Sequence, residues 1–238
     1  MSIDTTAYKR QAAERALAYV KSGMTVGLGT GSTAAQFVEL LGEMVRAGEL
    51  DLRCVPSSEA TRQIAERAGL TLDDFSEIHA LDLTVDGADE IDPQLNLIKG
   101  GGGALLREKI VAMASEEVCI IADHTKMVQR LGRFPLPVEV VEFGVAATMK
   151  MIEAAAEDAG CKATPVLRRD QFGEPFLTDS GHLIVDCAFG AIPDAELLAD
   201  VLDIVPGIVD HGLFIDLADR VIIAGPDGVS VREAEDPR

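Results

Sequence analysis

Cysteine and basic residues are both scarce in this 238-residue chain, and each shortage argues against a class of function. The four cysteines, Cys54, Cys119, Cys161 and Cys187, are dispersed, with no CxxC pair and no cluster with histidine, so neither a zinc site nor a redox pair nor a disulfide framework is indicated. The 21 basic residues face 40 acidic ones and form no run, which argues against a nucleic-acid-binding surface.

Long apolar runs are also lacking. None approaches membrane-spanning length, and the first residues carry charges where a secretory signal would have an apolar core. We therefore expect a cytoplasmic protein with reduced thiols, and no membrane or nucleic-acid partner. The net charge of −19 repels an anionic substrate at long range, so a phosphate site would need local donors.

What the chain does have is an alternation of strand and helix patterns in its first half. Short apolar runs predict buried strands at residues 24–28, 52–55, 81–86 and 118–122. Periodic stretches predict helices at residues 5–22, 33–47, 58–68 and 104–115. Strands separated by single helices imply right-handed crossovers, and hence a doubly wound, mostly parallel sheet covered on both faces.

The pattern changes after a proline-rich stretch that begins at Phe134. Beyond it we expect helices near 143–159 and 194–203, and strands near 163–168, 175–178 and 183–188. Residues 221–224 and 229–231 are typical of two strands joined by a turn, which would return to the first sheet. The chain should therefore form a larger α/β domain from 1–131 plus 206–238, and a smaller α+β domain from 132–205.

The first motif that indicates chemistry is Gly27-Leu28-Gly29-Thr30-Gly31-Ser32-Thr33, between a predicted strand and a helix. Glycines let backbone N–H groups approach an anion, and the helix N-terminus and three hydroxyls add further donors. A dinucleotide fingerprint would need glycine in place of Ser32 and an acidic residue after the next strand, so that interpretation is weak. Taken alone, the motif could equally be a capped glycine-rich turn.

The second motif is Val85-Asp86-Gly87-Ala88-Asp89-Glu90-Ile91-Asp92, at the end of a predicted strand. One aspartate is enough to cap a turn, so four carboxylates in seven residues indicate more than a turn and call for a cationic partner. A metal ion is disfavoured, because the spacing is not that of a calcium loop and only His79 lies nearby.

The third motif is Lys99-Gly100-Gly101-Gly102-Gly103, followed by a helix that contains Glu108. Ordering four glycines is unfavourable, which suggests a backbone that lies against a ligand. Considered singly, Glu108 could simply stabilise the helix dipole and Lys99 could be a solvated charge. Three such loops at the strand ends of one sheet instead favour a sugar-phosphate isomerase, which needs an anion site, a base and a group that stabilises an enediolate.

The segments GLGTGST, VDGADEI, KGGGGALLREK, ADHTK and RFPLPVEV together resemble the type A family of ribose-5-phosphate isomerases, over nearly the whole chain. The resemblance implies a Rossmann-like domain with a smaller α+β domain, usually in dimers or tetramers. It also implies interconversion of ribose 5-phosphate and ribulose 5-phosphate without metal or cofactor, in the pentose phosphate pathway and the Calvin cycle.

The resemblance assigns roles to residues at matching positions. Glu108 is the general base, and Asp86, Asp89 and Lys99 complete the catalytic set. The implied substrate contacts are Thr30, Gly31, Ser32, Thr33, Asp86, Gly87, Ala88, Asp89, Lys99, Gly100, Gly101, Gly102 and Lys126. Lys9 or Arg10 could assist phosphate binding, and Gly103 is a small departure, since other members often have alanine there.

Two rival functions follow from the same motifs. Aminosugar-phosphate deaminase-isomerases and CoA-transferases share a similar glycine-rich first loop, but the second and third motifs discriminate against them. A sugar-phosphate-sensing regulatory domain would have little use for a base such as Glu108. It would also normally carry a DNA-binding segment, for which the first 24 residues leave no room.

Overall fold

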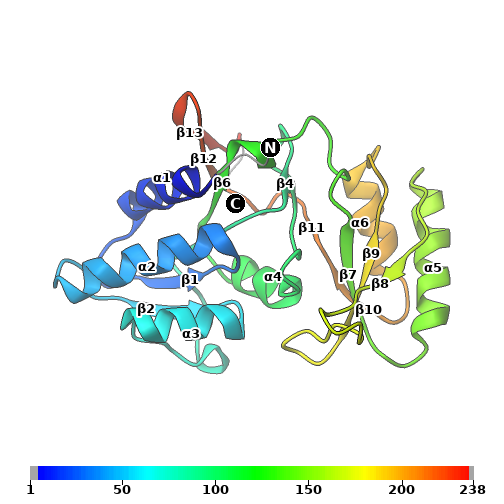
Figure 1. Cartoon of the computed structure of the whole chain (residues 1–238), viewed down its shortest axis with the longest axis horizontal. Coiled ribbons are helices and arrows are strands. Elements are labelled where there is room, and N and C mark those ends of the chain that lie inside the picture. The colour runs from blue at the N-terminus through cyan, green and yellow to red at the C-terminus, as the bar shows by residue number, and fades with distance from the viewer. Residues whose placement is uncertain (1–4, 236–238) are drawn as a thin grey trace. The chain divides into compact units, whose positions relative to one another are not determined.

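The computed structural model describes residues 5–235, which form two compact units (Figure 1). Unit 1 contains the described residues up to Ala88, residues 107–126 and those from Asp216 onward. Unit 2 contains residues 89–106 and 127–215. The chain therefore first enters unit 2 between Ala88 and Asp89, within the second motif, and returns between Leu106 and Arg107, just before Glu108.

Unit 1 is built on a six-stranded sheet with the order β13-β12-β6-β3-β1-β2. The strands are β1 (Thr25–Leu28), β2 (Arg53–Pro56), β3 (Leu83–Asp86), β6 (Val118–Asp123), β12 (Arg220–Gly225) and β13 (Gly228–Glu233). All neighbours are parallel except the β12–β13 hairpin. The predicted α/β fold with a mostly parallel sheet is therefore confirmed, and the last two strands do return to it.

Helices cover both faces of this sheet. They are α1 (Thr6–Ala16), α2 (Ser32–Arg46), α3 (Glu59–Ala68) and α4 (Leu105–Met113), with short 3-10 turns at Leu17–Tyr19 and Phe75–Glu77. Val26 and Leu28 of β1 point into a core shared with α1 and α2. Gly27 points the other way, toward Val111 of α4, because successive residues of a strand face opposite sides.

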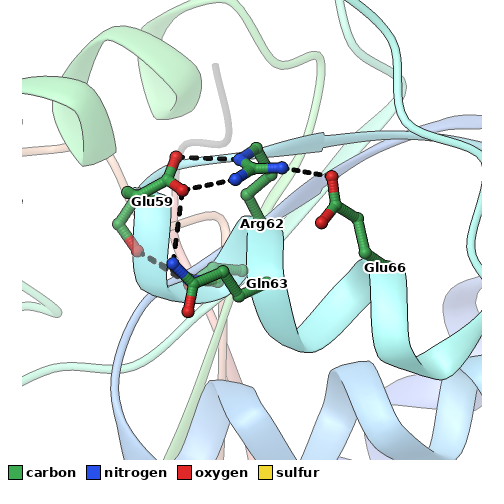
Figure 2. Close-up of polar contacts among 6 residues, drawn as sticks. Glu59, Arg62, Gln63 and Glu66 are labelled. Carbon is green, nitrogen blue, oxygen red and sulfur yellow. Dashed lines mark hydrogen bonds and ion pairs between the residues drawn. The ribbon is translucent and has the colours of Figure 1, made fainter.

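Helix α3 illustrates how local sequence fixes an element near the first motif. The hydroxyl of Ser58 accepts the N–H of Thr61 at 3.0 Å and so caps the helix. On the outer face, Arg62 binds Glu59 and Glu66, which lie one turn before it and one turn after it (Figure 2). These bonds to Arg62 lower the pKa of Glu59 to about 2. The first turn of α3 is thus well anchored.

Unit 2 contains two smaller sheets. The four-stranded sheet has the order β10-β7-β9-β8, from Ile208–His211, Leu136–Val140, Leu183–Cys187 and Val166–Leu167, and it is antiparallel. The three-stranded sheet has the order β11-β5-β4, from Leu213–Phe214, Leu97–Ile98 and Glu90–Ile91. Helices α5 (Val145–Asp158) and α6 (Ala195–Asp203) pack on the four-stranded sheet, where Leu136, Val138 and Val140 face the core.

Several features of unit 2 differ from the sequence-based expectation. Strand β7 was not expected, because Pro135 and Pro137 suggested a boundary. Pro137 is tolerated because β10 pairs only with residues 138–140, and because proline lacks only the N–H: its carbonyl still accepts the N–H of Gly212 at 2.8 Å. The predicted strand 175–178 is wrong, since only isolated bridges at Pro175 and Leu177 occur there.

The division into units also differs from the predicted domains, 1–131 plus 206–238 and 132–205. Residues 89–106 lie in unit 2, because their strands β4 and β5 pair with each other and with β11. The sequence offers no sign of this long-range pairing. Two-residue strands carry too little periodicity to be recognised.

Between residues 5 and 235, no helix is long and apolar enough to cross a membrane. In the same range, no group of three or more His, Cys, Asp or Glu side chains is arranged to hold a metal ion. All four cysteines are free and buried.

Candidate active site

The glycine-rich loop of the first motif lies directly against Asp86 in unit 1. It connects β1 to α2, and Gly31, at the N-cap of α2, has a φ of 101°, a conformation that favours glycine. The N–H of Thr30 donates to Oδ1 of Asp86 at 3.0 Å, and the N–H of Gly87 donates to the same oxygen at 2.7 Å. Asp86 is only 3 % exposed, so these two donors hold a buried carboxylate in one orientation.

A cluster of hydroxyls holds the same loop from the other side. Oγ1 of Thr30 lies 2.9 Å from Oγ of Ser57, 2.8 Å from Oγ of Ser58 and 3.2 Å from Oγ1 of Thr61. Thr61 also donates to the carbonyl of Gly29 at 2.9 Å. None of the three sequence motifs contains Ser57, Ser58 or Thr61. The pair Ser57-Ser58 at the end of a predicted strand was the available signal.

Positive charge reaches this loop from α1. Nζ of Lys9 donates to Oγ of Ser32 at 3.0 Å, so of the two suggested helpers it is Lys9 that contacts the loop. Lys126 ends a short 3-10 turn, His124–Lys126, that follows β6. The carboxylate of Asp123 accepts the N–H of Thr125 at 3.0 Å and so fixes that turn. Lys126 itself is half-buried.

Glu108 lies in the first turn of α4, as the sequence predicts. The side chain is 4 % exposed, which is unusual for a carboxylate and not what a solvated helix-end charge would show. Its burial requires partners or a function, because removing a charge from water is unfavourable. The residues that precede α4 are the glycines of the third motif.

In unit 2, Asp89 is bound to the glycine run. Its Oδ2 accepts the N–H of Gly101 at 2.7 Å, and its own N–H donates to the carbonyl of Ile98 at 2.8 Å. A Cβ atom on Gly101 would lie 2.7 Å from Oδ1 of Asp89, so any larger residue there would force the Asp89 carboxylate to move. Asp89 and Gly101, both predicted site residues, are therefore brought together.

Lys99 is 3 % exposed, so the interpretation as a solvated charge is wrong. Its Nζ lies 5.4 Å from the centroid of the Phe214 ring, within range of a cation–π contact. Its N–H donates to the carbonyl of Gly212 at 2.9 Å, which ties β5 to the segment between β10 and β11. A buried ammonium at this position can stabilise a developing negative charge.

Two of the four carboxylates in the second motif are structural. The carboxylate of Glu90 accepts the N–H groups of Gly132 at 2.7 Å and Phe134 at 2.8 Å. Oδ1 of Asp92 accepts two N–H groups of the following turn, from Gln94 and Asn96, at 2.9 Å each. Backbone donors therefore bind both Glu90 and Asp92. Glu90 also has a cationic partner of the kind inferred from the sequence, since Nε of Arg133 lies 3.7 Å from its Oε1.

The predicted residues divide between the units. Unit 1 holds Thr30, Gly31, Ser32, Thr33, Asp86, Gly87, Ala88, Glu108 and Lys126. Unit 2 holds Asp89, Lys99, Gly100, Gly101 and Gly102. Asp86, Lys99 and Glu108 are all buried ionisable groups, whereas Gly31, Ser32, Gly101 and Gly102 are exposed. Unit 1 thus supplies buried acids and unit 2 a buried ammonium, which are the kinds of group that proton transfer on an anionic ligand requires.

Comparisons with known proteins agree with these features. Residues 53–228 match the family model of ribose 5-phosphate isomerase A (phosphoriboisomerase A). Ribose-5-phosphate isomerase A of Rhodopseudomonas palustris (strain HaA2) is 60% identical over 225 residues, which cover 94% of this chain and 97% of that protein.

Solved structures give the same result. Ribose 5-phosphate isomerase from Plasmodium falciparum is 36% identical, with a TM-score of 0.92 over 97% of this chain and 100% of that one. A D-ribose-5-phosphate isomerase in complex with phospho-erythronic acid is 35% identical, with a TM-score of 0.87 over 98% of this chain and 100% of that one. The resemblance drawn from the motifs is therefore confirmed, and the chain belongs to the ribose 5-phosphate isomerase A family.

Proposed function

We propose that the chain interconverts D-ribose 5-phosphate and D-ribulose 5-phosphate by proton transfer, with Glu108 as the base. Family membership makes it an aldose–ketose isomerase rather than a sensor or a CoA-transferase. The observation that carries the assignment of the base is the burial of Glu108 in the first turn of α4, directly after the glycine run. A carboxylate kept from water there can transfer a proton to and from a bound substrate.

Asp86 opens the sugar ring in this scheme. Ribose 5-phosphate is largely a closed ring, so a proton must first move from the C1 hydroxyl to the ring oxygen. The two N–H groups on Oδ1 fix the plane of the Asp86 carboxyl, which supports a role that needs a defined direction of proton transfer.

Glu108 then removes the C2 proton and returns it to C1, through a cis-enediolate, while the proton of the C2 hydroxyl passes to the oxygen on C1. One carboxylate can serve both adjacent carbons. Lys99 supplies positive charge where the oxyanion develops, and Asp89 orients Lys99 or a sugar hydroxyl. The 3 % exposure of Lys99 supports this role, because a charge is more effective away from water.

The phosphate group binds at the first motif, through residues Thr30–Thr33 with Lys126 and Lys9. The contact between Lys9 and Ser32 supports this location, because it brings a local positive charge to a chain whose net charge is −19. The substrate's other contacts are Gly87, Ala88 and Gly100–Gly102. Phospho-erythronic acid, bound in a solved relative, carries a carboxylate in place of the reacting carbons, so we expect it to inhibit this chain competitively.

We further propose that the enzyme is a cytoplasmic homodimer or homotetramer of the pentose phosphate pathway. Proton transfer between adjacent carbons needs no redox or group-carrying cofactor, so we propose that it acts without metal or cofactor. Size-exclusion chromatography with light scattering would determine the oligomeric state.

The test is a coupled assay of ribulose 5-phosphate formation with Glu108→Gln. A general base contributes about 10²- to 10⁴-fold, so kcat should fall by that order while phospho-erythronic acid still binds. Glu59→Gln is the matched control, because Glu59 is also a first-turn glutamate but lies half-exposed on α3. Wild-type turnover by Glu108→Gln would remove Glu108 from its role. Activity that is lost in EDTA and restored by metal would favour hydride transfer.

A further inference from the structure

The glycine run of the third motif is held from outside by one arginine of unit 2. Arg168 follows β8 directly, and its Nη1 donates to the carbonyl of Gly100 at 2.9 Å and to that of Gly101 at 3.2 Å. The side chain is only 15 % exposed. None of the sequence motifs contains this residue, which lies about seventy positions after the glycines it contacts.

Asp186 of β9 fixes the guanidinium of Arg168. Nε donates to Oδ2 at 2.9 Å and Nη2 donates to Oδ1 at 2.5 Å, which is the two-bond geometry that sets the guanidinium plane. The Phe176 ring lies 5.8 Å from the guanidinium carbon. The same ring packs on Gly103, where a Cβ atom would lie 2.5 Å from Cζ. The segment between β8 and β9 therefore contacts the glycine run at both ends, through Arg168 at Gly100 and Gly101 and through Phe176 at Gly103.

The geometry links Arg168 to Asp89 through one peptide group. The carbonyl of Gly100 and the N–H of Gly101 belong to the same planar unit and point in opposite directions. Arg168 binds the carbonyl, and Asp89 accepts the N–H at 2.7 Å. A cation on one side and an anion on the other polarise the peptide, which strengthens both hydrogen bonds.

Glycine alone would not hold this peptide in place. Gly100 has a φ of 99°, and glycine moves between positive and negative φ with little resistance. The run therefore needs an external anchor to keep Asp89 and the neighbouring Lys99 in a reactive arrangement. A partly buried ion pair is a poor source of stability by itself, which leaves positioning as the better explanation of Arg168 and Asp186.

We infer that Arg168, oriented by Asp186, is a positioning residue for catalysis, acting through the Gly100–Gly101 peptide on Asp89 and the Lys99 segment. The inference rests on the proposed function, since it assigns Arg168 to the same site. Arg168 does not touch the substrate in this scheme.

The experiment measures kcat and KM for ribose 5-phosphate with Arg168→Met, which keeps the apolar stem. A misplacement near 1 Å can lower turnover about 100-fold, so we expect kcat to fall about 10- to 100-fold with KM within about threefold. Arg168→Lys should recover part of the loss, because it restores the charge without the two-bond geometry. Arg169→Met is the control, since the Arg169 side chain donates to the carbonyl of Gly173 in an exposed turn, and it should behave as wild type.

A double-mutant cycle with Asp89→Asn separates positioning from general loss of structure. If Arg168 acts through Asp89, Asp89→Asn should lower kcat much less in the Arg168→Met background than in the wild-type chain. Independent effects that simply multiply, or an Arg168→Met kcat within twofold of wild type, would overturn the inference. If Arg168→Met does not fold, Asp186→Asn, which preserves both side-chain volumes, is judged by the same measures. An unaltered chain without isomerase activity would instead contradict the proposed function.

Discussion

Replacing Gly29 by alanine tests the most crowded contact in the candidate site. Gly29 lies where β1 passes the end of β3, and its N–H donates to the carbonyl of Val85 at 2.9 Å. A Cβ atom there would lie 2.5 Å from Cα of Asp86 and closer still to its carboxyl group. Carbon atoms in contact are about 3.5–4.0 Å apart, so the loop or the end of β3 must move by about 1 Å.

Two effects of Gly29→Ala lower the free energy of unfolding. Overpacking of a tight contact costs about 1–3 kcal/mol. Loss of the bond from the Thr30 N–H to the Asp86 carboxylate costs about 1.5–3 kcal/mol. The free energy of unfolding should therefore fall by about 2.5–6 kcal/mol, and the melting temperature by about 5–20 °C. A shift of Asp86 by about 1 Å should also lower kcat about 100-fold.

Calorimetry and the coupled isomerase assay measure the two effects. Gly87→Ala is the control for stability, because its Cβ atom would lie 3.7 Å from the nearest atom, the carbonyl oxygen of Thr30, and its φ is not positive. That variant should stay within about 1 kcal/mol of wild type. If Gly29→Ala has the same melting temperature as Gly87→Ala and a wild-type kcat, the contact between Gly29 and Asp86 is not as tight as described.

Two further predictions concern groups outside the catalytic set. Glu90→Gln should lower the free energy of unfolding by about 2–4 kcal/mol, because an amide cannot accept both backbone N–H groups, yet leave kcat unchanged; a fall in kcat at unchanged stability would contradict a purely structural role. Burial raises the pKa of three thiols from 9.0 to about 12. The folded chain then keeps protons that the unfolded chain loses, so their contribution to stability is complete below pH 9 and declines as pH rises toward about 12, by about 1.4 kcal/mol per thiol and pH unit. The thiols concerned are Cys54, Cys119 and Cys187. Urea titrations from pH 8 to 11 should show the free energy of unfolding falling with pH, and the fall should be less steep in Cys54→Ala.

The larger sheet could be predicted because most of its strands are buried, although the edge strand β13 is exposed. Val118–Asp123 and its neighbours appear in the sequence as short apolar runs between helices, a pattern that local sequence alone specifies. Unit 2 could not be predicted to the same degree. Its strands β4, β5 and β11 have two residues each, and β7 contains a proline whose tolerance depends on where β10 ends.

The candidate site likewise has features that the sequence predicts and features that only the fold reveals. Glycine runs and charges mark the motifs, and the burial of Glu108 and Lys99 agrees with the importance that their setting suggests. The sequence could not tell which acids of the second motif are structural, because Glu90 binds N–H groups more than forty residues away. Arg168 was missed for the same reason, since only the folded hairpin brings it to Gly100.

The position of β12 in the sheet has a consequence for synthesis on the ribosome. β12 pairs with β6, yet about a hundred residues separate them, and all of unit 2 after Lys126 is made in between. Until residues 220–225 emerge, one edge of β6, a strand buried along its whole length in the finished fold, has no partner. Such an edge is a template for pairing between chains, so nascent or truncated chains without β12 should depend on chaperones to avoid aggregation.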